Sequence, residues 1–192
     1  MKRDIELSLE KDAEIYKSKD HGPGSREKLL DMIAKSAYDN DRGYEGCSRS
    51  VFAALQTHLH LMPEEAYREC LKACTALSGG VARKGEVCGA LTAGIMALSA
   101  LTASEKMESF EHYQKAMLIS GLLFDRFREK FGTTKCVEVQ EQLLGRTYDF
   151  NKEEDRDAWY KDGGLHYCPL VCGEAARMAA ELILRIREEQ GE

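Results

Sequence analysis

Apolar side chains recur along most of this chain at the three- and four-residue spacing of amphipathic helices. The spacing predicts a helix that begins at Ser25 and ends at the polar stretch 38–43, and another over about 46–59. Pro63 suits the first position of a further helix, which the glycine-containing stretch 78–80 ends. No alternating run of useful length indicates strands.

The second half of the chain continues this pattern. Residues 87–104 carry no charge, but their glycine, serine and threonine content favours a central helix packed by others over a membrane span. A long amphipathic helix follows over 108–131, and a short one over 136–144. A polar stretch then extends to residues 163–164, and we expect the last helix to begin at Pro169. The predicted fold class is therefore all-α, a bundle of six or seven helices.

Residues 1–24 differ from the rest of the chain because most of them are polar. We interpret them as an N-terminal arm, and residues 25–192 as a single helical domain that carries the cysteines. The arm is too poor in apolar side chains to fold alone, but it is long enough to cross a subunit boundary. Together with the phenylalanines spaced by seven residues in the long helix, the arm favours a homodimer.

Composition narrows the classes of function. The chain has 33 acidic and 27 basic residues, a net charge of −6 and no basic block, so no nucleic-acid partner is expected. Its first residues are charged throughout and lack the apolar segment of a secretory signal, so we expect a cytoplasmic protein without a membrane partner. In a reducing cytosol, seven cysteines indicate metal binding or redox chemistry more readily than structural disulfides.

Four of the cysteines share one local setting. Each lies at or within the first turn of a predicted helix, and the four are Cys47, Cys88, Cys136 and Cys168. A helix start has unpaired N–H groups and a partial positive charge, which favour the thiolate that attacks disulfides and binds metals. Cys172 is an auxiliary candidate, since it lies one turn after Cys168 and the two could share a disulfide or a metal.

The remaining candidates have simpler interpretations. Cys70 and Cys74 lie four residues apart on the apolar face of one helix, where packing explains them. His166 is close to a candidate thiol in sequence, but we interpret it as a solvated loop residue. The chain contains no Cys-x-x-Cys-His sequence, so covalent haem is not expected, and it has no zinc-finger spacing. No catalytic residue can be named from these patterns.

The cysteine blocks, taken in order, resemble the C-GCAxxG-C-C family of redox-active proteins, which is similar to a domain of split-Soret cytochromes. The blocks are residues 46–56, 78–96, 132–146 and 168–177. One departure is Ala93, which stands where the family usually has glycine, with Gly94 next to it. The resemblance implies a cytosolic redox protein. Its four cysteines fit the ligand count of an iron–sulfur cluster, two dithiol pairs, or a tetrahedral zinc site.

The leading hypothesis is a redox-active protein that uses clustered cysteines for thiol–disulfide or iron–sulfur electron transfer. Whether this amounts to an oxidoreductase-like enzyme is left open. One alternative is a structural protein in which zinc fixes four helix ends. Another is an enzyme with a cysteine nucleophile that acts on a small molecule. The sequence names neither the electron donor nor the acceptor.

Overall fold

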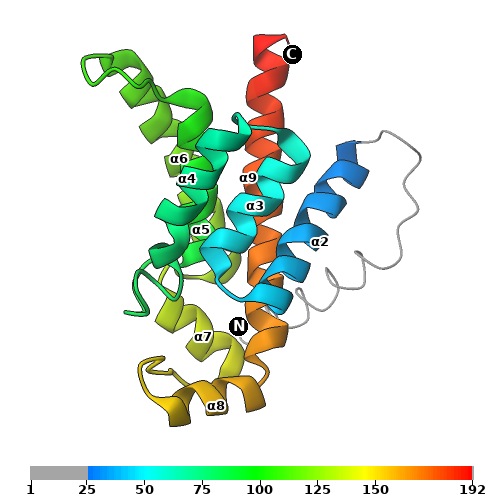
Figure 1. The fold of residues 1–192 in the computed structure, drawn as a ribbon, viewed down its shortest axis with the longest axis vertical. Coiled ribbons are helices and arrows are strands. Elements are labelled where there is room, and N and C mark those ends of the chain that lie inside the picture. Colours follow the sequence, from blue (N-terminus) through cyan, green and yellow to red (C-terminus); the bar gives the residue numbers. More distant parts are fainter. Residues whose placement is uncertain (1–25, 192) are drawn as a thin grey trace.

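The computed structural model describes residues 26–191, which fold into α-helices (Figure 1). In chain order these are α2 (Arg26–Tyr44), α3 (Cys47–Leu59), α4 (Glu64–Cys74), α5 (Gly89–Thr102), α6 (Phe110–Phe131), α7 (Cys136–Leu144), α8 (Glu153–Lys161) and α9 (Gly164–Gln190). A 3₁₀ turn, η1 (Thr75–Leu77), extends α4. The all-α fold class is confirmed, and the described residues contain eight helices rather than six or seven. The predicted arm, residues 1–24, lies outside the described residues.

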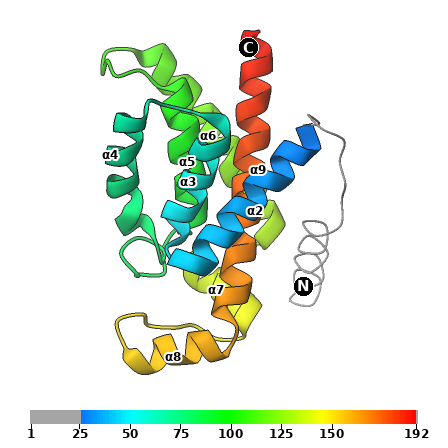
Figure 2. The ribbon, with the colours of Figure 1, turned by 45° about the vertical axis from the view of Figure 1, so that its right-hand side comes forward.

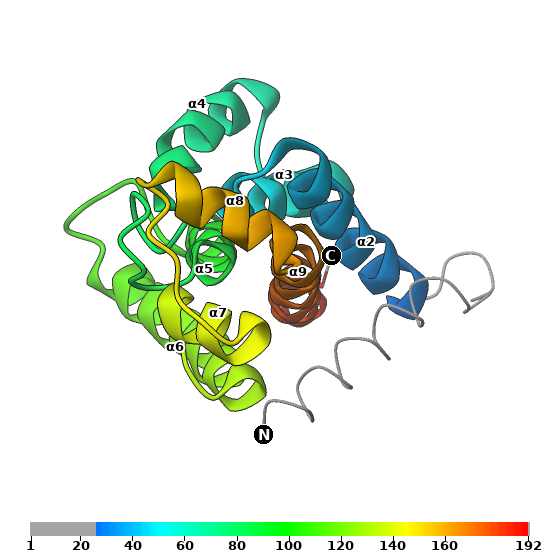
Figure 3. The ribbon, with the colours of Figure 1, turned by 90° about the horizontal axis from the view of Figure 1, so that it is seen from below.

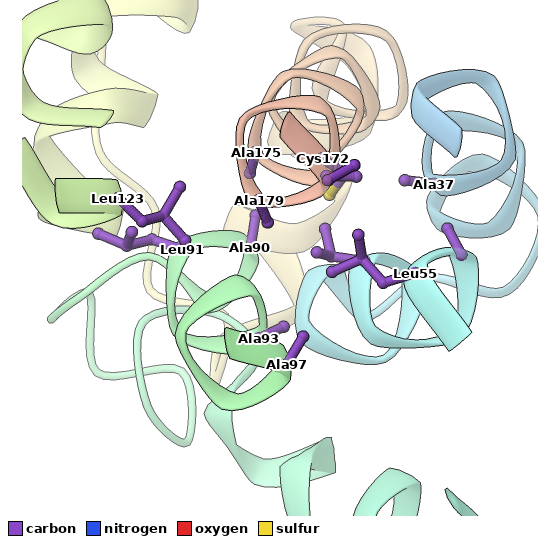
Figure 4. Close-up of a cluster of buried hydrophobic side chains, with 14 of the residues drawn as sticks. Ala37, Leu55, Ala90, Leu91, Ala93, Ala97, Leu123, Cys172, Ala175 and Ala179 are labelled. Carbon is purple, nitrogen blue, oxygen red and sulfur yellow. The ribbon is translucent and has the colours of Figure 1, made fainter. Parts of the chain in front are cut away.

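Helix α9 is the axis of the bundle, and α2 crosses it diagonally (Figure 2). It packs against α2, α3, α5 and α6. Its buried side contains a series of alanines that let neighbouring backbones approach closely. In Figure 4, Ala175 and Ala179 lie beside Ala90 of α5, and Cys172 lies on the side of α9 that faces α2 and α3.

The uncharged helix α5 packs against α3, α6 and α9, as its composition predicts. A Cβ atom on Gly94 would lie 2.7 Å from the Leu123 side chain of α6 and 3.3 Å from Ala179 of α9. The small residue at this position therefore sets how closely the three helices approach. None of the helices described combines the length and the apolar character that crossing a bilayer requires.

The prediction that the first helix ends at the stretch 38–43 is wrong, because α2 continues to Tyr44. The stretch contains no proline, and its polar residues do not all face solvent. Asp41 lies on the same face as the buried Ala34 and Ala37 and is itself only 4% exposed. A hydrogen-bonded carboxyl group thus occupies a position where the hydrophobic pattern expects an apolar side chain.

Two features near the end of the chain differ from the sequence pattern. Helix α8 forms within the polar stretch, where no helix is predicted. Trp159 is its only buried residue, so no periodic apolar pattern indicates this helix. Helix α9 begins at Gly164 rather than Pro169, after Gly163 in a left-handed conformation with φ of 93°. The ring of Trp159 packs on Gly164 so closely that a Cβ atom there would lie 2.0 Å from it.

Helices α7 and α8 lie at the end of the bundle where α9 begins (Figure 3). The amino-terminal ends of α3 and α5 and the turn that precedes α5 contribute to the same region. This end therefore brings together the residues that sequence analysis singles out, although they are spread from position 47 to position 172.

Candidate functional site

A cavity of about 630 Å³ lies among these helix ends. Five cysteines line it, and all of them are free thiols: Cys47, Cys88, Cys136, Cys168 and Cys172. They come from α3, the residue before α5, α7 and α9. The structure therefore brings the four candidate cysteines and the auxiliary one around a single cavity, while their role as redox or cluster-binding residues stays a prediction.

The other two cysteines lie elsewhere. Cys74 is completely buried in the core, as packing on an apolar face predicts. Cys70 is partly exposed beside that core, and neither residue lines the cavity. His166 is exposed in the first turn of α9 and does not line the cavity either.

Three of the four candidates stand at helix starts. Cys47 and Cys136 are the first residues of α3 and α7, and Cys88 is the residue that caps α5. Cys168 does not follow the prediction, since α9 begins four residues earlier and places it one turn inside the helix. Its presence in the cavity thus depends on the packing of α9 and not on a helix end.

The sequence predicts that helix starts lower the pKa of these thiols, but burial raises it. Burial raises the pKa of Cys47 to about 12 and that of Cys88 to about 11. For Cys136, Cys168 and Cys172, burial raises the pKa well above its ordinary value, and negative charge on neighbouring groups raises it further. All five are therefore neutral thiols at neutral pH.

Backbone N–H groups oppose this increase without overcoming it. The N–H of Gly79 donates to the Cys47 sulfur, and the N–H groups of Ala90 and Leu91 donate to the Cys88 sulfur. Each bond favours the thiolate and lowers the pKa of its cysteine below what burial alone would give. At Cys88 the donors belong to the first turn of α5, so the helix-start effect is present there, but it is smaller than the cost of placing a charge in this cavity.

A buried carboxyl group accompanies the thiols. Asp41 of α2 lines the cavity, receives a hydrogen bond from Ser50 Oγ at 3.4 Å, and receives another from the Cys172 thiol. Burial raises the pKa of Asp41 to about 6, although both hydrogen bonds act in the opposite direction. Sequence analysis missed this residue. The available signal was its position four residues after Ala37, on the buried face of α2.

The chain between η1 and α5 forms a turn of left-handed helix that borders the cavity. Five consecutive residues, 79–83, have φ between 52° and 67°. Val81, Ala82 and Arg83 are not glycine, and a left-handed conformation costs such a residue about 1–2 kcal/mol. Strain of this kind persists only where surrounding contacts hold it, and it is concentrated at functional sites.

Helix α7 packs against this turn at Gly80 and is bonded to the residues that follow the turn. The N–H of Cys136 donates to the Glu86 carbonyl at 2.6 Å, and the N–H of Cys88 donates to the Thr134 carbonyl at 2.8 Å. A Cβ atom on Gly80 would lie 2.7 Å from Cys136 Cβ, so glycine is required where the turn meets α7. These backbone bonds fix Cys88 and Cys136 relative to each other.

The cavity cysteines can be compared with the ligands of the two metal centres expected from the sequence, zinc and an iron–sulfur cluster. Thiolates on several helices are the ligands of zinc and of iron–sulfur clusters. Among residues 26–191, however, no three His, Cys, Asp or Glu side chains form a group that could hold a metal ion. The zinc alternative therefore has no preformed single-ion site among the described residues.

Fold and site together define a class, an all-α protein with free thiols around one cavity. The chain belongs to the family described as "Putative redox-active protein (C_GCAxxG_C_C)", whose model matches residues 45–182. The match confirms the resemblance, and its range contains all five cavity cysteines but not Asp41. The searches of curated proteins and of solved structures found no match.

Proposed function

We propose that this chain is a thiol-based redox protein that transfers electron pairs through the cysteine cavity. The observation that carries the proposal is the gathering of five free thiols and a buried carboxyl group around one cavity. Membership of a family described as redox-active supports it. A reducing cytoplasm is the compartment in which such thiols would stay free between turnovers.

Cys47 and Cys88 are one pair placed for this chemistry. The Cys47 sulfur would lie 2.5 Å from a Cβ atom on Gly89, the residue that follows Cys88. After burial, negative charge on Cys88 is the largest influence that raises the pKa of Cys47. Oxidation of two such thiols to a disulfide releases two electrons and two protons. In exchange with a disulfide R–S–S–R, the acceptor takes both and leaves as two R–SH molecules.

Exchange requires a thiolate, so a proton must leave one of these neutral thiols first. Asp41 is the group placed to receive it, because it is buried among the thiols and already accepts the hydrogen bond of Cys172. Its role is to hold a proton at the wall of the cavity, beside the thiols. Sequence analysis identified no catalytic residue, and we assign this positioning role from the geometry.

Thiol counting under controlled redox conditions tests the proposal. The chain, purified without oxygen, is equilibrated with mixtures of reduced and oxidised dithiothreitol, alkylated in denaturant and weighed by mass spectrometry. We expect two thiols to be lost in one step, and Cys88→Ser to abolish that step. Cys70→Ser, outside the cavity, is the matched control and should keep it. A count of seven free thiols in every mixture would show that the proposal is wrong.

A second candidate function is iron–sulfur electron transfer. It is favoured by the origin of the thiols, since Cys47, Cys88, Cys136 and Cys168 come from four separate segments and surround a cavity. These four would be the ligands, and a bound cluster would supply one-electron transfer. Iron and sulfide analysis of anaerobically purified protein tests this candidate. Stoichiometric zinc in a colourless sample would instead support the structural alternative.

A further inference from the structure

Three guanidinium groups line the same cavity as the thiols. Arg49 comes from α3, Arg83 from the left-handed turn and Arg156 from α8. Two carboxyl groups also line it: the buried Asp41, and Glu45, whose carboxylate accepts a hydrogen bond from the Tyr160 hydroxyl at 2.5 Å. Positive groups therefore outnumber negative ones, in a chain whose overall charge is −6.

Backbone carbonyls, rather than carboxylates, hold these guanidinium groups. Arg49 donates to the carbonyl oxygen of Glu45 at 2.8 Å, and Arg156 donates to that of Phe150 at 3.0 Å. None of the three arginines forms an ion pair with a carboxylate of residues 26–191, whereas Arg177 of α9 pairs with Asp31. A carbonyl fixes the position of a guanidinium group without neutralising its charge, and the nearby Asp41 carboxyl compensates the charge of Arg49 in part.

Arg83 and Arg156 share one acceptor. Both donate through Nη1 to the Phe150 carbonyl, at 3.5 and 3.0 Å, so two positive charges lie side by side. The hydrogen bond to Glu45 raises the pKa of Tyr160, while the charges of Arg156 and Arg83 act in the opposite direction, which places both near this phenol. Like charges this close repel each other, and an anion bound between them would relieve the repulsion.

The indole of Trp159 lies at the wall of the cavity beside one of its thiols. The residue is 7% exposed and lines the cavity, and its Nε1–H has no nitrogen or oxygen acceptor among the described residues. The Nε1–H instead donates to the sulfur of Cys168, and this bond opposes the increase that burial causes in the pKa of that thiol. The indole therefore fixes the Cys168 thiol at the wall of the cavity, where a bound disulfide would meet it.

We propose that the cavity binds a small carboxylate-bearing disulfide, with Arg83 and Arg156 holding a carboxylate and Arg49 adding positive charge, so that the S–S bond lies against the thiols. The redox part of this inference rests on the proposed function, whereas the anion binding does not. A cavity of about 630 Å³ is within the size range of small-molecule sites, so it accommodates such a compound. The electron acceptor in this inference is a low-molecular-weight anion.

The reaction balances without any other co-reactant. One cavity thiol, deprotonated, attacks the ligand's S–S bond and forms a mixed disulfide as the first R–SH leaves. A second cavity thiol attacks the mixed disulfide and releases the second R–SH. The two protons of the protein thiols end on the two released molecules, and the protein keeps one disulfide.

A series of disulfides that differ in charge tests the inference. The probes are 3,3′-dithiodipropionate, which is dianionic, 2-hydroxyethyl disulfide, which is neutral, and cystamine, which is dicationic. We expect the full chain to react fastest with the dianion and slowest with the dication. In the double variant Arg83→Gln/Arg156→Gln, the rate ratio of dianion to neutral disulfide should fall about tenfold, which corresponds to one lost charge-assisted contact. Arg68→Gln, on α4 outside the cavity, is the matched control and should keep the ratio.

Suberate separates binding from redox chemistry. It has nearly the shape of 3,3′-dithiodipropionate but no S–S bond, and it should bind the reduced chain in calorimetry and inhibit the reaction with the dianion. Equal rates with all three probes, together with no suberate binding, would overturn the anion site while leaving the redox function standing. If suberate binds in an arginine-dependent way but no probe reacts, the anion site is supported and the proposed redox function is wrong.

Discussion

The Cys172 thiol of α9 donates a hydrogen bond to the Asp41 carboxylate of α2. Both side chains are almost inaccessible, at 0% and 4% exposure, although Asp41 lies in a stretch that reads as a polar loop. The bond joins two helices at the wall of the cavity. The bond lowers the pKa of Asp41, but burial raises that pKa by more, and this net increase makes the stability of the fold depend on pH.

The Asp41 carboxyl should destabilise the fold as pH rises. Its pKa is raised from 3.8 to about 6, so between these values the folded chain holds a proton that the unfolded chain has lost. The contribution of this bound proton to the free energy of unfolding is fully present below about pH 4 and is lost as pH rises through about 6. The change is about 3 kcal/mol. Glu45 and Arg49 act on the same carboxyl, in opposite directions.

Urea unfolding at several pH values measures this contribution. In Asp41→Asn, the fall in unfolding free energy between about pH 4 and 7 should be smaller than in the wild type by about 3 kcal/mol. Asp39→Asn, on the same helix but exposed, is the control and should leave the pH profile unchanged. Identical profiles for wild type and Asp41→Asn would contradict the buried, proton-binding state of this carboxyl.

The cavity thiols should resist alkylation in the folded chain. All five are neutral, Cys88, Cys136 and Cys172 are also buried, and alkylating agents attack thiolates. With iodoacetamide at neutral pH, mass spectrometry should find Cys70 modified first, because it is partly exposed and outside the cavity. In urea all seven cysteines should react at similar rates. Equally rapid modification of Cys88 and Cys70 in the folded chain would contradict the buried site.

Gly89→Ala should destabilise the fold and disturb the site. The new Cβ atom would lie 2.5 Å from Cys47 Sγ and 2.8 Å from the Leu77 carbonyl oxygen, so the backbone of η1 must shift. We expect a loss of about 1–3 kcal/mol in thermal or urea unfolding. Gly121→Ala in α6 is the matched control, since nothing lies within 4 Å of its added atom. That change should stabilise the fold by up to about 1 kcal/mol, because alanine is the better helix former.

The homodimer remains a prediction, and α6 offers a surface for it. Its exposed large apolar side chains lie on one face: Phe110, Tyr113, Met117, Leu118 and Leu122. A second copy related by a two-fold axis would cover this face with its own α6. Light scattering should then give twice the chain mass of 21.6 kDa, and Leu118→Glu should reduce the mass to that of one chain. Met32→Glu, on α2, is the control, and a wild-type mass near 21.6 kDa would refute the dimer.

The positions of the thiols can be predicted from the sequence better than the residues that surround them. Cys47 and Cys136 follow breakers that mark helix starts, and such marks are local and readable in the sequence. The position of Arg156 in the same cavity depends on α8, a helix with only one buried residue, so no periodic pattern reveals it. The direction of the thiol pKa shifts also escaped prediction. It is decided by burial, which arises only when helices distant in sequence pack together.

The left-handed turn at residues 79–83 has a consequence for the order in which the molecule is assembled. Three consecutive L-residues in this conformation, Val81 to Arg83, give the segment no tendency to form by itself. Its backbone hydrogen bonds run within the segment and to Ala76 and Leu77 of η1, and it meets α7 where Gly80 lies close to Cys136. The turn therefore depends on η1 for its conformation, and the cavity wall at Cys136 is complete only when α7 packs against Gly80.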